Sequence, residues 1–225
     1  MTSPQNTITV NIWSDIACPW CYIGKRKFES ALKEYRESDN AAEVSVEYHS
    51  YQLSPDVPVG FEGDQLEYLS KNKGMPLEQV KQMVNQVSSV AKTVGLDYDM
   101  DSVKMTNTQL AHELLHFAKS KGKQHELKER LMSAFFVEGG RVGNAESLAD
   151  YAAEIGLDRA EALEAMNAHQ FEDAFKADVA QARAFGINGV PFFVFNEKYG
   201  VSGAQDSSTF LQVLNQVASD TAEEA

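Results

Sequence analysis

The chain has 225 residues, of which 43% are hydrophobic and 24% are charged, and its formal net charge is −13. This length allows one large domain or two small ones with a sizeable core. The acidic balance argues against nucleic acid and anionic membranes as partners, because both need a basic footprint. No run approaches the roughly 20 apolar residues of a membrane span. The polar first residues lack the features of a secretory signal, so we expect a cytoplasmic protein.

The first fifty residues predict a strand, a helix and a second strand. Residues 8–13 alternate as a strand does, with β-branched side chains on one side. From Pro19 to about Arg36, apolar residues recur at helical spacing. Pro19 suits the first helical turn because its missing N–H would have no partner there. Residues 43–49 alternate again and predict the second strand.

The long middle of the chain predicts helices and no strands. Gly95, Gly156 and Gly186 are each followed by an apolar residue, which is the arrangement of a Schellman cap. Asp158 and Glu161 are spaced as a capping box at the start of a helix. The segments with helical spacing are 66–73, 77–94, 106–120, 126–137, 145–155, 159–166 and 171–185.

The last forty residues return to strand character. An apolar run at 192–195, a turn at 196–198 and a return at 199–201 predict a hairpin, and 207–218 predict a final helix. The element order therefore predicts an α/β thioredoxin fold, β-α-β then β-β-α, interrupted by a large all-helical insertion. We expect a discontinuous thioredoxin-like domain of residues 1–55 and 186–225 and a helical insertion domain of residues 56–185.

Cys18 and Cys21 are the only cysteines, and they lie between the first predicted strand and the first predicted helix. Thiol–disulfide exchange needs a thiolate, which the unpaired N–H groups at a helix start favour at Cys18. Cys21, one turn on, can resolve a mixed disulfide, while Pro19 and Trp20 stiffen the loop and shield one flank. A zinc site would need more ligands, and structural disulfides are rare in the cytoplasm. The alternative is a pair of buried, small apolar residues.

Val190 and Pro191 lead into the predicted strand at 192–195. The ordinary interpretation is a trans peptide bond and a proline at the start of an edge strand. A cis-proline loop beside the dithiol would instead expose the Val190 backbone to an extended substrate. Such a loop would also keep metal ions away from the cysteines.

Several motifs resemble those of one known family. The segment Ser-Asp-Ile-Ala-Cys-Pro-Trp-Cys-Tyr-Ile-Gly at 14–24 resembles the active-site segment of DsbA-like oxidoreductases, specifically their FrnE-like branch. The resemblance continues in Tyr-Gln-Leu-Ser-Pro-Asp at 51–56, Asn-Thr-x-x-Ala-His at 107–112, Gly-Val-Pro-Phe-Phe-Val at 189–194 and Ser-Gly-Ala-Gln at 202–205.

The resemblance implies a thioredoxin fold with an inserted helical domain and a cis bond before Pro191. It also implies that Cys18 is the attacking or attacked thiol and that Cys21 is its resolving partner. The Pro-Trp dipeptide between the cysteines differs from the Pro-His of the periplasmic prototype, so we do not expect a strongly oxidising potential. The second cysteine pair of some FrnE-like proteins is absent, which excludes a relay between two dithiols.

The run 112–116 matches the His-Glu-x-x-His signature of zinc proteases, with His112 and His116 as ligands and Glu113 as the base. The extended signature requires Gly at position 119 and His at position 122. This chain has Lys119 and Gly122 there, so a third ligand is missing and we predict no metal site.

If the insertion covers the dithiol, four polar residues are candidates to line the cleft above it: Asn107, Thr108, His112 and Gln205. Each also has an ordinary structural role. Asn107 or Thr108 suits a helix N-cap, His112 a hydrogen-bonded place in the core, and Gln205 the start of the last helix.

The sequence favours a thiol–disulfide oxidoreductase that acts on protein or low-molecular-weight thiol and disulfide substrates. It would need no bound cofactor, with glutathione as a candidate co-substrate. One alternative is a glutathione-dependent isomerase or kappa-type transferase, although those relatives usually have Ser in place of Cys18. Another is a redox-independent, chaperone-like binding protein.

Overall fold

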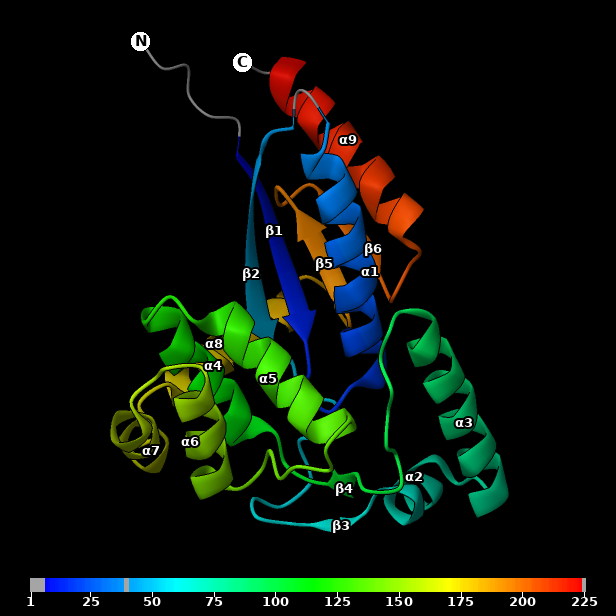
Figure 1. The fold of residues 1–225 in the computed structure, drawn as a ribbon, viewed down its shortest axis with the longest axis vertical. Helices are drawn as coiled ribbons and strands as arrows, with labels where there is room; N and C mark the ends of the chain where they lie inside the picture. The colour runs from blue at the N-terminus through cyan, green and yellow to red at the C-terminus, as the bar shows by residue number, and fades with distance from the viewer. Residues whose placement is uncertain (1–6, 39–40, 224–225) are drawn as a thin grey trace.

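A four-stranded mixed sheet forms the centre of the protein in the computed structural model, which describes residues 7–38 and 41–223 (Figure 1). The strand order is β2-β1-β5-β6. The central strand β1 runs parallel to β2 and antiparallel to β5, and β6 pairs antiparallel with β5. The strands are β1 (Thr7–Ser14), β2 (Glu43–Ser50), β5 (Phe192–Phe195) and β6 (Tyr199–Ser202).

Helices cover both faces of this sheet. Helices α1 (Pro19–Arg36) and α9 (Ser207–Glu223) lie side by side on one face (Figure 1). Alternate side chains of β1 and β5 turn toward these two helices and build an apolar core with Phe28 and Phe210. On the opposite face Trp13 and Val194 pack against Ala182 of helix α8 (Glu172–Ala184).

The chain between β2 and β5 forms the helical insertion, most of which lies beyond the end of the sheet where β1 and β2 finish (Figure 1). Its helices are α2 (Gln65–Lys73), α3 (Leu77–Thr93), α4 (Gln109–Ser120), α5 (Gln124–Phe136), α6 (Ala145–Glu154), α7 (Arg159–Asn167) and α8 (Glu172–Ala184). The fold class predicted from the sequence is confirmed. The division into domains at residues 55 and 186 fits this arrangement and stays a proposal.

One prediction for the insertion was wrong. Two short strands, β3 (Gly63–Asp64) and β4 (Lys104–Met105), pair antiparallel within it. A two-residue strand is too short to show alternation, so the sequence carried no signal for it. The pairing of β4 also delays the start of α4 to Gln109, three residues later than expected.

The predicted helix ends are confirmed in detail. Gly95, Gly156 and Gly186 all have positive φ, and the residue after each donates its N–H to a carbonyl five residues back. Asp158 caps α7 by accepting the N–H of Glu161 at 2.8 Å. None of the described helices combines the length and apolar character needed to cross a membrane.

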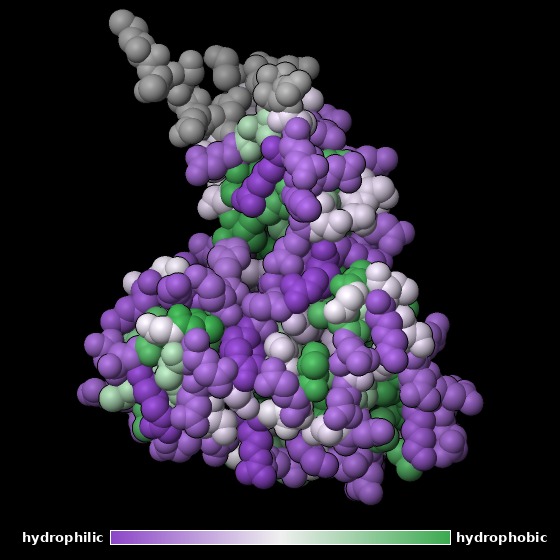
Figure 2. Space-filling model, viewed as in Figure 1, coloured by the Kyte–Doolittle hydropathy of each residue, from purple (hydrophilic) through white to green (hydrophobic). Residues whose placement is uncertain are grey.

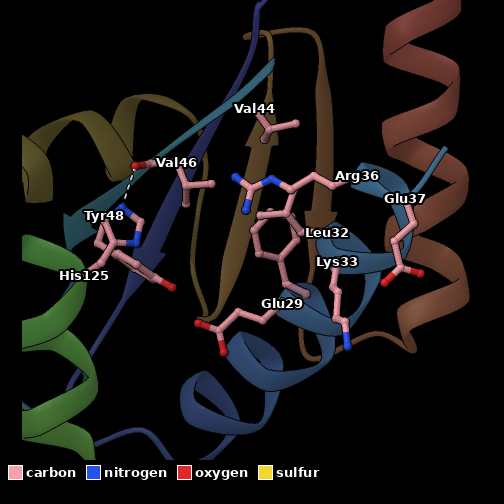
Figure 3. Close-up of a pocket in the computed structure, with 10 residues that line it drawn as sticks. Glu29, Leu32, Lys33, Arg36, Glu37, Val44, Val46, Tyr48 and His125 are labelled. Carbon is pink, nitrogen blue, oxygen red and sulfur yellow. Dashed lines mark hydrogen bonds between the residues drawn. The ribbon is translucent and has the colours of Figure 1, made fainter. Parts of the chain in front are cut away.

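A hollow of about 500 Å³ opens between β2 and α1, away from the start of α1. Figure 2 shows apolar surface in this upper part of the molecule, on a face that is otherwise mostly hydrophilic. Val44, Val46 and Leu32 line it together with charged side chains of α1 (Figure 3). His125 of α5 closes one side through a 2.9 Å hydrogen bond to the Val46 carbonyl. The free edge of β2 is therefore partly covered.

Candidate active site

The dithiol lies where β1 ends and α1 begins. Cys18 is the N-cap residue of α1, with φ −94° and ψ 112°, and Pro19 occupies the first helical position. Two backbone hydrogen bonds shape the turn, from Cys18 N–H to Asp15 O (3.3 Å) and from Cys21 N–H to Cys18 O (3.0 Å). The two cysteines approach to 3.4 Å, and both are at least 97% buried. They are therefore close enough to form a disulfide with little motion.

The proline loop between α8 and β5 closes one side of the dithiol. The Val190–Pro191 peptide bond is cis, as the resemblance implied, and the Cys18 thiol donates to the Val190 carbonyl at 3.5 Å. The loop is fixed by the Gly203 N–H, which donates to Pro191 O at 2.8 Å. Gly24 lets the loop approach α1, because a Cβ at this position would lie 2.9 Å from Pro191 Cγ. The sequence separates these parts, and the fold brings them together.

A buried acid–imidazole pair supports the turn before Cys18. Asp15 Oδ1 lies 3.2 Å from His112 Nε2 of α4, and Asp15 Oδ2 accepts the N–H of Leu53 at 2.8 Å. Burial alone would raise the pKa of Asp15, but His112 and the Leu53 N–H more than offset it and lower that pKa. Burial also lowers the pKa of His112. The pair ties the active-site turn to the insertion.

The two thiols titrate as a unit because they share a hydrogen bond. The hydrogen bond with Cys21 raises the pKa of Cys18, and burial acts in the same direction. Burial opposes ionisation of Cys21 as well. The hydrogen bond from Cys18 and the positive charge of Lys128 more than offset that effect and lower the pKa of Cys21. The pair therefore shares one proton, and its first negative charge is stabilised by the hydrogen bond between the two sulfurs and by Lys128.

Sequence reasoning missed Lys128, a lysine of α5 that is only 1% exposed. Its Nζ donates to the carbonyl of Ser14 at 3.4 Å and lies 5.7 Å from the centre of the Tyr48 ring. Burial lowers its pKa to about 8. The missed signal is its place in the apolar stripe of α5, where the buried positions recur at 124, 127, 128, 131, 132 and 135.

Three of the four residues expected to line a cleft above the dithiol are buried in the fold, and their role in such a cleft stays a prediction. These three are Asn107, Thr108 and His112. Asn107 and His112 form hydrogen bonds within the protein, whereas Thr108 Oγ1 and His112 Nδ1 have no hydrogen-bond partner among the described residues. Asn107, for example, accepts from Gln52 Nε2 at 2.8 Å and donates to the Val57 carbonyl at 2.5 Å, which fixes the loop after β2. Asn107 therefore holds the loop after β2, and His112 holds Asp15 in the turn before Cys18.

Two further predicted residues lie at the surface. Gln205 is exposed, and its amide donates to the Ser202 carbonyl at 2.8 Å, beside the proline loop. Trp20 is 42% exposed, so its ring forms part of the surface next to the cysteines. Both side chains therefore differ from Asn107, Thr108 and His112, which are buried.

The His-Glu-x-x-His run of α4 points to three separate partners. His112 meets Asp15, whereas His116 Nε2 lies 3.1 Å from Asp178 Oδ2. Glu113 instead accepts from His169 at 3.1 Å. Within residues 7–38 and 41–223, no three His, Cys, Asp or Glu side chains are grouped to hold a metal ion. The run connects α4 to its neighbours.

Comparison with known proteins agrees with this geometry. The family model of the DSBA-like thioredoxin domain matches residues 9–215. The chain belongs to this family. The crystal structure of a probable DsbA oxidoreductase from Streptomyces coelicolor is similar, with 36% identity and a TM-score of 0.86, over 93% of this chain and 89% of the other.

Two more relatives extend this comparison. The uncharacterized protein YwbO of Bacillus subtilis is 28% identical over 211 residues, 93% of this chain and 96% of its own length. The cytosolic disulfide reductase DsbM from Pseudomonas aeruginosa, solved with GSH, shares the fold at 18% identity and a TM-score of 0.61, over 96% of this chain and 98% of that chain. Membership of the FrnE-like branch stays a prediction from the sequence motifs.

Proposed function

We propose that this protein is a thiol–disulfide oxidoreductase in which Cys18 exchanges disulfides with the substrate and Cys21 resolves the intermediate. The observation that carries the proposal is the placement of Cys18 at the N-cap of α1, 3.4 Å from Cys21 and beside the Val190 carbonyl. A helix N-terminus favours a thiolate, and a second thiol at this distance can complete the exchange.

In the reducing direction, the Cys18 thiolate attacks one sulfur of a substrate disulfide. A Cys18–substrate bond forms as the substrate S–S bond breaks, and the leaving thiolate takes a proton from water. Cys21, as a thiolate, then attacks the Cys18 sulfur and expels the second substrate thiolate, which is protonated in turn. Two electrons pass from the dithiol to the substrate, and the relative reduction potentials decide whether the steps run in this direction or in reverse.

Access to Cys18 bears on the class of substrate. Cys18 is 3% exposed, because Val190 lies on one side of it and the insertion approaches from the other. The contact from the insertion includes Tyr98, whose hydroxyl donates to the Pro19 carbonyl at 2.8 Å. A slender group suits this approach, such as a low-molecular-weight disulfide, with glutathione disulfide as an example, or a disulfide on an extended segment of a protein.

The decisive experiment compares Cys18→Ser with Cys21→Ser in an assay of insulin reduction and of glutathione-disulfide reduction. We expect Cys18→Ser to reduce exchange to the uncatalysed background. Cys21→Ser is the matched control, which should form a mixed disulfide at Cys18 that persists and is detected by mass spectrometry. Full exchange activity in Cys18→Ser would contradict the proposal.

The same variants separate the alternatives. Glutathione-dependent turnover that survives in Cys21→Ser would favour an isomerase or transferase. Suppression of aggregation that is unchanged when both cysteines are replaced would favour a chaperone-like binding protein.

A further inference from the structure

Lys128 occupies an unusual environment for a lysine. Its side chain is 1% exposed and reaches beneath the end of β1. Lys25, which is also buried, pairs with Glu29 and Glu129 at 2.6 Å each. Within the described part of the chain, by contrast, Lys128 forms no ion pair with a carboxylate and has the Ser14 carbonyl as its hydrogen-bond acceptor. A buried cation without a counter-ion costs free energy, so its retention calls for an explanation.

Ser14 links Lys128 to the dithiol. Its carbonyl accepts from Lys128 Nζ, and its side chain lies close enough to Cys21 to help lower the pKa of that thiol. Lys128 Nζ and the Cys21 sulfur therefore both lie next to Ser14.

The other ionisable groups near Lys128 have defined partners or charge states. Asp15, in the turn after β1, is bound by His112 of α4 and by a backbone N–H. Lys25 of α1 is neutralised by its two carboxylates. Tyr48 of β2 is held as the neutral phenol, because burial raises its pKa. Asp15 and the cysteine pair are therefore the anions near Lys128 among the described groups, and the cysteine pair is the one that loses its charge when the disulfide forms.

We propose that Lys128 is the proton partner of the dithiol, charged while Cys21 is a thiolate and neutral once Cys18 and Cys21 form a disulfide. This inference rests on the proposed exchange function, and Lys128 acts in it as a positioning residue through Cys21. Its role is to make the thiolate of the resolving step available inside a buried site.

The electrostatics follow from this arrangement. Burial lowers the pKa of Lys128 to about 8, while the negative charges of Cys21, Asp15 and Cys18 act to raise it. Disulfide formation removes the cysteine charges, so the amine then releases its proton more readily. In the mixed disulfide, Cys21 holds the proton that the two sulfurs had shared, so the amine no longer faces a thiolate and releases its own proton to water. The neutral amine then accepts the proton of Cys21 and becomes the counter-ion of the attacking thiolate.

Protons and electrons balance over the cycle. The reduced dithiol holds one proton between its two sulfurs, and Lys128 holds a second. Oxidation transfers two electrons to the substrate disulfide, joins Cys18 to Cys21 and releases both protons to water. The two substrate thiolates take up two protons and leave as thiols.

The test measures thiolate absorbance at 240 nm against pH in the reduced protein, together with the rate at which Cys21 resolves a mixed disulfide at Cys18. In Lys128→Met we expect thiolate formation to shift upward by at least one pH unit and resolution at pH 7 to slow at least tenfold. The difference in rate should disappear above about pH 10, where Cys21 ionises without help. Lys25→Met is the matched control, and its thiolate titration should stay within a few tenths of a pH unit of the wild type.

An unchanged titration in Lys128→Met would overturn the inference, because a purely structural lysine would alter stability alone. If this variant does not fold, the wild-type protein provides a second measurement. Nitrogen NMR should give a higher pKa for Lys128 Nζ in the reduced protein than in the disulfide form, and equal values would overturn the inference. Neither the thiolate titration nor the NMR measurement needs a substrate, so these two outcomes are independent of the Cys18→Ser assay that tests the proposed function.

Discussion

At its start, β1 contributes Ile8 and Val10 to an apolar core, whereas at its end Ser14, and Asp15 directly after it, lie among ionisable side chains. At the apolar end, burial stabilises the folded state roughly in proportion to the apolar surface area removed from water. At the polar end, hydrogen bonds and ion pairs mainly offset the cost of burial. One strand therefore stabilises the fold at one end and holds chemically reactive groups at the other.

Phe210→Ala should give the largest loss of stability. Phe210 is fully buried on α9, with its ring centre 5.6 Å from that of Phe28 and 4.6 Å from that of Phe193. We expect the free energy of unfolding to fall by about 3–5 kcal/mol, through lost burial and a cavity. Denaturation in urea measures this loss. The thiolate titration of the folded protein should not move, and a shift would show that the two ends of β1 are coupled.

Lys128→Met should stabilise the protein at pH 7. The folded pKa of Lys128 is about 8 and its ordinary value is 10.5, so the unfolded state binds more protons between these values. Stability of the wild type should therefore rise with pH from about 8 to about 10.5, by at most about 3 kcal/mol. The free energy of unfolding of Lys128→Met should not rise over this pH range. Urea unfolding should therefore show that the variant is more stable than the wild type at pH 7 and about equally stable near pH 10.5. A variant less stable at pH 7 would mean that Lys128 contributes to stability.

Gly24→Ala tests the contact between α1 and the proline loop. The added methyl group would lie 2.9 Å from Pro191 Cγ and 3.4 Å from Ala204 Cβ. We expect a loss of about 1–3 kcal/mol from overpacking and slower disulfide exchange, because the loop must move relative to Cys18. Thermal unfolding and exchange rates measure both effects. Ser30→Ala, on the exposed side of the same helix, is the control and should change neither by much.

Glu129→Gln should have the smallest effect. Burial opposes ionisation of Glu129, but Arg26 and Lys25 lower its pKa to about 2. The stabilisation of the folded protein by the ionised Glu129 side chain is therefore complete above about pH 4.5 and is lost as the pH falls toward 2. Because the side chain is one-third exposed, we expect only about 1 kcal/mol at pH 7. Chemical denaturation at pH 7 in low and high salt should show that difference shrinking with salt.

The sequence predicts the parts of the site that depend on local chain geometry. Pro19 at the first helical position, Cys18 before it and Cys21 one turn later are all set within a few residues. The supporting groups are set by tertiary packing. Asp15 and His112 are 97 residues apart, so their pairing depends on where the insertion docks. Lysine is rarely buried, so the charge of Lys128 outweighed its place in the apolar stripe of α5. The groups that Lys128 contacts depend on how α5 packs against the sheet.

The pairing of β1 with β5 has a consequence for the order in which the protein is made. Val190 follows Cys18 by 172 residues, so the chain carrying the two cysteines leaves the ribosome long before the loop that covers them. At ordinary rates of synthesis that interval is on the order of 10 to 30 seconds. During it, β1 lacks β5, its neighbour on one side, and the nascent dithiol is open to cellular oxidants and reductants. Each new dithiol therefore meets oxidants and reductants before its substrate site exists.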